Sequence, residues 1–182
     1  MHVRAAVVVA LLAAAVPAAG CGGDDEQQEP LPRAKGGLQL ESPAFSAGGT
    51  IPEKYSCVGG DVSPPLRWRG VPSAAKELAL VVEDPDGGGF LHWTVLNIPP
   101  GADRFAEGAL PSGATETEND FEERAWGGPC PPAGDEPHRY VFVLYALRKR
   151  LGLGPDASRD QVRRALAGAA LARGTLTGRF GR

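Results

Sequence analysis

Two proline-rich turns, each leading into a strand that opens with a histidine, constrain this chain more than any other feature. The first turn, Asp84-Pro85-Asp86, precedes His92-Trp93, and the second, Gly-Pro-Cys-Pro-Pro at 128–132, precedes His138-Arg139-Tyr140. Because proline fixes φ and has no N–H donor, each turn ends one element and directs the next. The strands that follow are β-branched and aromatic, which is typical of buried strands. We therefore expect two imidazoles at the entrances of two core strands, an arrangement suited to a small anion pocket.

Short extended segments separated by turns continue along the chain and favour an all-β sandwich. Residues 101–137, rich in Gly, Pro, Thr and acids, predict a mostly irregular stretch. The segments that we expect to be extended are 38–42, 51–57, 66–68, 77–83, 92–98, 139–147 and 174–180, the last of them as an edge strand.

One helix is predicted near the C-terminus. Ser158 and Gln161 fit a capping box, and Asp160 suits the positive end of a helix. The apolar residues that follow repeat at helical spacing, at Val162, Ala165, Leu166 and Ala169.

The first twenty residues predict an export signal. His2 and Arg4 give a basic start, and residues 5–16 form an unbroken apolar run, shorter than the roughly 20 residues that span a bilayer. Small residues at 18–20 lead directly into Cys21, as in a bacterial lipobox. We expect lipidation of Cys21 and anchoring at the extracytoplasmic face of the cell membrane. Since a larger aliphatic residue is more usual at position 18, release of a soluble secreted protein is the alternative.

Residues 21–37 predict a disordered tether, because Leu31 is their only large apolar side chain and such a composition cannot bury a core. Residues 38–182 then form one domain of ordinary size. The formal charge of the full chain is −3, and loss of the signal makes it more acidic by removing Arg4. Without a Lys/Arg cluster interleaved with aromatics, no nucleic-acid partner is expected.

The three cysteines agree with export. If Cys21 carries lipid, Cys57 and Cys130 remain, and an even pair in an oxidising compartment favours a disulfide. Two unlinked thiols are the alternative. No Cys-x-x-Cys occurs, so neither thioredoxin-like chemistry nor a zinc ribbon is expected.

The chemistry of the predicted pocket follows from its side chains. His92 and His138 offer N–H donors and can become cationic near neutral pH, so an anion should bind more tightly as the pH falls through about 6.5. Tyr140 adds a hydroxyl, and backbone N–H groups of residues 131–134 would complete an anion nest. Asp84 and Asp86 are acceptors, so we expect them to orient the imidazoles or to receive the amine of a head group.

The same motifs, in this order, resemble the phosphatidylethanolamine-binding protein family, above all its bacterial Raf-kinase-inhibitor-like branch. The resemblance covers residues 38–182 and adds Ser42-Pro43-Ala44-Phe45, Ser63-Pro64-Pro65-Leu66 and Gly178-Arg179-Phe180-Gly181 to the motifs above. It implies a large central sheet packed on a smaller one, with peripheral helices. It also implies that the strand with Cys57 lies near the loop with Cys130.

The resemblance further implies a ligand pocket that accepts phosphate-like and carboxylate groups. The residues that it places there are Asp84, Asp86, His92, Pro131, His138 and Tyr140. The family often continues Asp-Pro-Asp with Ala-Pro, whereas this chain has Gly87-Gly88-Gly89, so we expect a more flexible rim.

The leading hypothesis is a non-catalytic, exported binding protein for a small anion or a phospholipid head group, without cofactor or metal. Neither His-Glu-x-x-His, Gly-x-Ser-x-Gly nor a P-loop occurs, which disfavours an enzyme. A phosphoester hydrolase using the same pocket is one alternative. The other, suggested by inhibitors among the family's members, is a module that binds an extracytoplasmic protein or inhibits a serine protease. Its contact loop would be 101–137, with the acids Glu116, Glu118, Asp120, Glu122 and Glu123.

Overall fold

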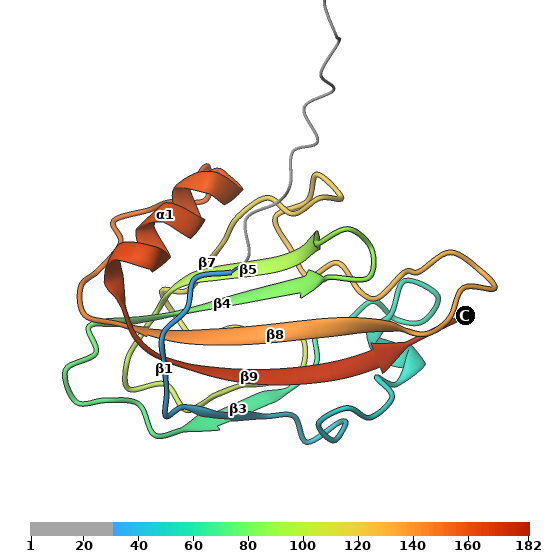
Figure 1. The fold of residues 1–182 in the computed structure, drawn as a ribbon, viewed down its shortest axis with the longest axis horizontal. Coiled ribbons are helices and arrows are strands. Elements are labelled where there is room, and N and C mark those ends of the chain that lie inside the picture. The colour runs from blue at the N-terminus through green and yellow to red at the C-terminus, as the bar shows by residue number, and fades with distance from the viewer. Residues whose placement is uncertain (1–30) are drawn as a thin grey trace, which may run out of the picture.

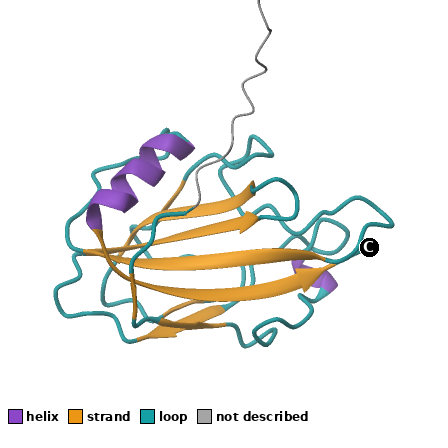
Figure 2. Cartoon of the chain, in the orientation of Figure 1, coloured by secondary structure: helices purple, strands orange, loops and turns teal. Residues whose placement is uncertain are grey.

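The computed structural model describes residues 31–182 (Figure 1), so the predicted signal and Cys21 lie outside the described residues. Two sheets pack face to face, and one α-helix lies on the outer side of the larger sheet (Figure 2). The six-stranded sheet has the order β1 (Lys35–Gly36), β9 (Ala170–Phe180), β8 (His138–Leu147), β4 (Glu77–Asp84), β5 (Phe90–Ile98) and β7 (Thr115–Glu116). The three-stranded sheet has the order β2 (Gln39–Glu41), β3 (Leu66–Arg69) and β6 (Arg104–Phe105). The mainly β sandwich predicted from the sequence is confirmed.

The central strands are buried on both faces, which explains their continuous apolar sequences. On β4, Leu80 and Val82 point into the main core between the sheets, whereas Ala79 and Val81 point to the outer face. Helix α1 (Arg159–Ala169) covers part of that outer face with three buried side chains, Val162, Leu166 and Ala169. The domain therefore has one core between the sheets and a second one beneath the helix.

Helix α1 begins as the sequence predicts. The Ser158 hydroxyl accepts the backbone N–H of Gln161, and the Gln161 side chain accepts the N–H of Ser158, which completes the capping box. No helix within residues 31–182 combines the length and apolar character needed to cross a membrane.

The extended segment predicted at 51–57 is wrong. A short 3-10 helix, η1 (Glu53–Tyr55), occupies its centre, held by the bonds from Tyr55 N–H to Pro52 O and from Ser56 N–H to Glu53 O. Pro52 has no N–H to give to a sheet, and its fixed φ suits the start of such a turn. Ile51 and Tyr55 are buried, but pairing of this segment with β9 is limited to an isolated bridge between Thr50 and Arg179.

The fold begins before the predicted boundary at residue 38. β1 pairs in parallel with β9, Lys35 opposite Ala172, and the Tyr145 hydroxyl donates to Pro32 O at 2.9 Å. Leu31 packs against the second core. Residues 31–36 therefore belong to the domain, because β9 offers them an open edge and the outer face offers Leu31 an apolar surface.

Candidate functional site

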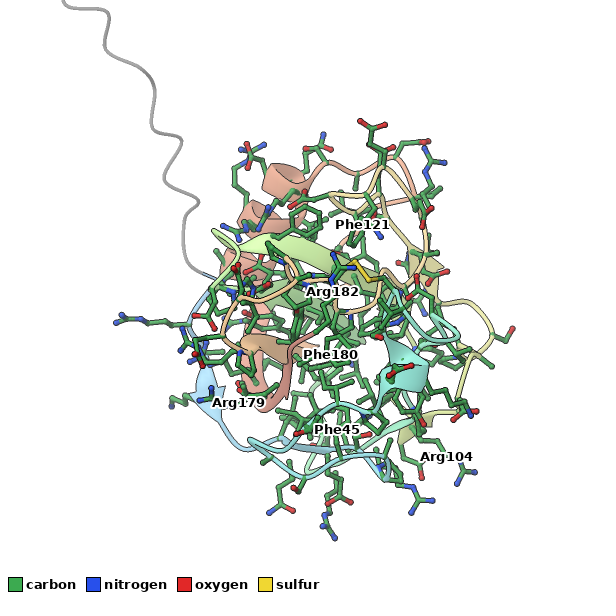
Figure 3. All side chains as sticks on the ribbon, turned by 90° about the vertical axis from the view of Figure 1, so that its right-hand side faces the viewer. Phe45, Arg104, Phe121, Arg179, Phe180 and Arg182 are labelled. Atoms are coloured by element: carbon green, nitrogen blue, oxygen red, sulfur yellow. A yellow bond between two sulfur atoms is a disulfide. The ribbon has the colours of Figure 1, made fainter. Side chains whose placement is uncertain are left out.

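The candidate site lies at the end of the large sheet where β4 stops and where β5 and β8 begin. β4 and β8 are antiparallel neighbours with Glu83 opposite Val141, so Asp84 and His138 meet at this end. Figure 3 looks onto it, with the yellow disulfide drawn between the labels of Phe121 and Arg182. Sheet register thus brings together two motifs that lie 54 positions apart in the chain.

A cavity of about 420 Å³ opens among these motifs. Its lining includes Asp84, Asp86, Phe90, His92, Phe121, Cys130, Pro131, Asp135 and His138. Five of the six residues expected in the pocket therefore line one cavity. The sixth, Tyr140, is fully buried beside it, with its ring centroid 5.1 Å from that of His92.

Asp84 holds His138 in one orientation. Its Oδ2 accepts the Nδ1–H of His138 at 2.7 Å, and its Oδ1 accepts the backbone N–H groups of Asp86 and Gly87, both at 2.9 Å. This hydrogen bond raises the pKa of His138 above its ordinary value. His138 is thereby favoured as a cation whose Nε2–H is the ring donor left for another group.

His92 is in the opposite electrostatic state. Its side chain is buried, and Nδ1 lies 2.7 Å from Gly127 O, an acceptor that places the ring proton on Nδ1. Burial lowers the pKa of His92, so the ring is neutral at pH 7 and its Nε2 carries a lone pair. Sequence reasoning gave both histidines the same role, whereas their surroundings make one a donor and the other an acceptor.

Asp86 is committed to Arg139 at the rim. Arg139 donates its backbone N–H, Nε–H and Nη2–H to the Asp86 carboxylate, at 2.5–3.2 Å. These hydrogen bonds lower the pKa of Asp86 to about 2. Arg139 is exposed, and it holds the turn that carries Asp86. Within residues 31–182, no hydrogen bond joins Asp86 to an imidazole.

Two phenylalanines form an aromatic wall that sequence reasoning missed. Phe90 and Phe121 contact each other edge to face at 4.7 Å, and Phe121 lies 5.4 Å from the His92 ring. Phe121 packs over Gly127, where a Cβ would lie 2.4 Å from its ring. Because Phe121 comes from an acidic, irregular loop, only the tertiary contact with Gly127 reveals its place.

Three of the four residues expected in the anion nest at 131–134 have no free N–H donor. Pro131 and Pro132 have no N–H, and the N–H of Gly134 donates to Arg182 O at 3.0 Å. Arg182 also binds Pro131 O through its Nε at 2.5 Å. The C-terminal residue thus fastens this wall of the cavity and uses the donor that an anion would need.

A disulfide between Cys57 and Cys130 fixes the same wall, with the two Cα atoms 5.4 Å apart. Cys57 lies just after η1 and Cys130 directly precedes Pro131, so the bond links these two segments. The sequence favoured this pair, and the structure contains it. Within residues 31–182, no three His, Cys, Asp or Glu side chains are grouped as a metal site.

The 101–137 stretch is only partly packed against the sheet, and more than half of its residues are exposed. Glu116 accepts the indole N–H of Trp93 at 2.6 Å, and Asp120 accepts the backbone N–H of Leu91 at 2.6 Å. Two of the five acids expected on a contact loop therefore have internal partners. Three remain on the surface, Glu118, Glu122 and Glu123.

Comparison with known proteins decides the family. The family profile described as phosphatidylethanolamine-binding protein matches residues 41–181. The chain belongs to this family. The crystal structure of a phosphatidylethanolamine-binding protein homologue from Chlamydia trachomatis, CT736, superposes with a TM-score of 0.75 at 39% identity, covering 81% of this chain and 99% of that one. Escherichia coli YbcL, described as a member of the mammalian family, gives a TM-score of 0.75 at 33% identity, covering 80% and 98%.

Relatives of this family member include one that is named as a lipoprotein. Mycobacterium tuberculosis LppC, which carries the name of a lipoprotein, is 44% identical over 153 residues, 83% of this chain and 75% of LppC. A UPF0098 protein of Methanothermobacter thermautotrophicus is 42% identical over 80% of this chain and 99% of its own length.

Proposed function

We propose that this family member is a non-catalytic, exported binding protein whose histidine cavity holds a small anionic group, such as a phosphate or a phospholipid head group. One observation carries the proposal: two imidazoles from separate strands line one cavity, and Asp84 favours the charged form of one of them. A cation held by a buried carboxylate is a ready partner for an anion.

The two imidazole rings favour a ligand that can both accept and donate a hydrogen bond. His138 presents Nε2–H, and neutral His92 presents the lone pair of its Nε2. A phosphate that carries one proton satisfies both, with P–O⁻ toward His138 and P–OH toward His92. The buried Tyr140 hydroxyl has no hydrogen-bond partner among the described residues and adds an unused donor beside the cavity.

An amine on the same ligand would find an acceptor in Asp135. Its carboxylate lies 3.8 Å from His138 Nε2 and is half exposed. Asp84 and Asp86, the acids that the sequence suggested for this role, are already bound to His138 and Arg139. The cavity therefore favours a zwitterion such as phosphorylethanolamine over inorganic phosphate, because only the zwitterion uses Asp135.

Export and lipid anchoring form the second part of the proposal. They rest on the apolar run and the Cys21 motif, which lie outside the described residues, and on the lipoprotein name of LppC. Labelling with a radioactive fatty acid in a bacterial host tests the anchor. Label in the wild type but not in Cys21→Ser is expected, and equal label in both contradicts lipidation at Cys21.

Calorimetric titration with phosphorylethanolamine tests the cavity. His138→Gln keeps the size of the side chain but removes its charge, and loss of a charge-assisted hydrogen bond should weaken binding about tenfold or more. Arg69→Gln, an exposed change on β3, is the control and should bind like the wild type. Absence of binding at millimolar ligand, or equal affinity of His138→Gln and the wild type, contradicts the proposal.

A further inference from the structure

A second cavity lies across the β4–β5 turn from the histidine cavity, on the outer face of the six-stranded sheet. It has a volume of about 570 Å³, within the range of sites for drug-sized ligands. Alternate residues around this turn line the two cavities: Asp84 and Asp86 line the histidine cavity, and Glu83 and Pro85 line the second cavity. The larger cavity is therefore separate from the proposed anion site but shares its rim.

The floor of this second cavity is apolar. Val141 and Val143 project from β8 onto the outer face, and Leu31 closes one side. The buried side chains of helix α1 lie on the same face in one cluster with Tyr145, which is two residues beyond Val143 on β8. The helix thus leaves uncovered the end of the strand nearest the β4–β5 turn, and an aliphatic group there would bury the two valines.

A buried arginine with an unused donor lines the same cavity. The Arg163 side chain is 10% exposed, and its Nη2 donates to Glu83 Oε1 at 2.5 Å. The same Glu83 oxygen accepts Arg159 Nη2 at 2.8 Å, so two guanidinium groups share one carboxylate. The Nε–H of Arg163 has no partner among the described residues. Arg163 therefore lines the cavity as a cation that shares its one carboxylate partner with Arg159.

The residues that line the cavity carry more positive than negative charge. Arg33, Arg163 and Arg173 line it, and Glu83 is the one acid among the lining residues that the structure describes. Arg173 forms no ion pair within residues 31–182, and the hydrogen bond that its Nη1 donates to Pro32 O is long, at 3.5 Å. Arginine at the edge of an apolar floor is suited to bidentate binding of a carboxylate or phosphate.

We infer that this outer-face cavity is a second binding site, for an anion that carries an aliphatic chain. The anionic head lies against Arg163 and Arg173, and the chain lies on Val141, Val143 and Leu31. The inference does not depend on the histidine cavity, because no residue lines both.

Calorimetry with three ten-carbon probes tests the inference on the full chain. Decanoate and decyl phosphate carry the two anionic head groups, and decanol carries the chain alone. We expect both anions to bind at least tenfold more tightly than decanol. The tighter of the two identifies the natural head group as carboxylate or phosphate, and either order supports the site.

Two pairs of variants locate the binding. Arg173→Gln should weaken the anions about tenfold, whereas Arg164→Gln, on the exposed side of α1, should not. Thr175→Trp fills the cavity from an exposed position on β9 and should abolish binding, whereas Thr177→Trp, two residues along the same face and outside the lining, should not. All four positions are on the surface or partly exposed, so the variants should fold.

Several results would overturn the inference. Decanol that binds as tightly as the two anions would overturn it, and so would Thr175→Trp that binds them like the wild type. Loss of decanoate binding in His138→Gln but not in Thr175→Trp would show that decanoate binds in the histidine cavity instead. His138→Gln should instead lose phosphorylethanolamine and keep decanoate, which separates the two sites.

Discussion

Removal of the Cys57–Cys130 disulfide should cost this domain a large part of its stability. The cysteines are 73 positions apart, and the loss of loop-closure entropy in the unfolded chain for a loop of this size corresponds to about 4 kcal/mol. Both side chains are only partly buried, so the double variant Cys57→Ala/Cys130→Ala leaves little additional cavity. For a domain of this size the loss corresponds to a fall in Tm of about 10 °C.

The native fold should survive this change, because other contacts hold the two segments together. The indole N–H of Trp126 donates to Tyr55 O at 3.1 Å, and the N–H of Gly128 donates to Asp61 at 2.7 Å. The effect should therefore appear as lower stability of a native state, with an unchanged circular dichroism spectrum.

Urea unfolding followed by tryptophan fluorescence measures the difference. The wild type in reductant should unfold at the midpoint of the double variant, and reductant should not move the double variant further. A loss below about 1 kcal/mol in the double variant would refute the chain-entropy argument.

Three further predictions concern single sites. In an NMR pH titration, His138 should titrate above pH 6.5, and Asp84→Asn should lower the midpoint of this titration. Because the pKa of His138 is raised in the folded state, the Asp84–His138 pair contributes its full stability below about pH 6.5. This contribution is lost as the pH rises through the folded-state pKa of His138. Ser158→Ala should remove the helix cap and cost about 1 kcal/mol in urea unfolding, whereas Ser158→Asp should not. Gly178→Ala should cost about 1–3 kcal/mol in the same assay, because its Cβ would lie 2.5 Å from Ile51 Cγ1. Thr177→Ala, at the partly exposed neighbouring position, is the control and should change stability little.

Local signals in the sequence were sufficient for most elements of the fold. The capping box at Ser158 predicted where α1 begins, because the bonds that form it join residues three apart. Continuous apolar runs predicted β4 and β8, since both faces of these strands are covered. The same reasoning failed at Ile51 and Tyr55, which are buried in and next to a 3-10 turn. In so short a segment, the spacing of two buried residues does not distinguish such a turn from a strand.

The site was only partly predictable for a related reason. The histidines and Asp84 stand next to proline turns, which mark strand ends, and so their positions could be inferred. Pairing of Asp86 with Arg139 joins residues 53 positions apart, and the placement of Phe121 depends on its contact with Gly127. No spacing rule in the sequence encodes such tertiary contacts.

The protonation states of the two histidines were also beyond the sequence. Both follow a turn and open a strand, yet one meets the Asp84 carboxylate and the other meets the Gly127 carbonyl in a buried position. These neighbours raise the pKa of His138 and lower that of His92. A single binding transition near pH 6.5, expected from the sequence, is therefore replaced by two separate titrations.

The histidine cavity as an anion site is the central claim, and the nitrogen chemical shifts of its two imidazoles test it most directly. Long-range ¹H–¹⁵N NMR spectra should show mainly the cation for His138 at pH 6.5 and the neutral Nδ1–H tautomer for His92 at pH 7. Phosphorylethanolamine should shift the Nε2 signals of both rings and raise the titration midpoint of His138. Saturating ligand that leaves both Nε2 signals unchanged would contradict the claim.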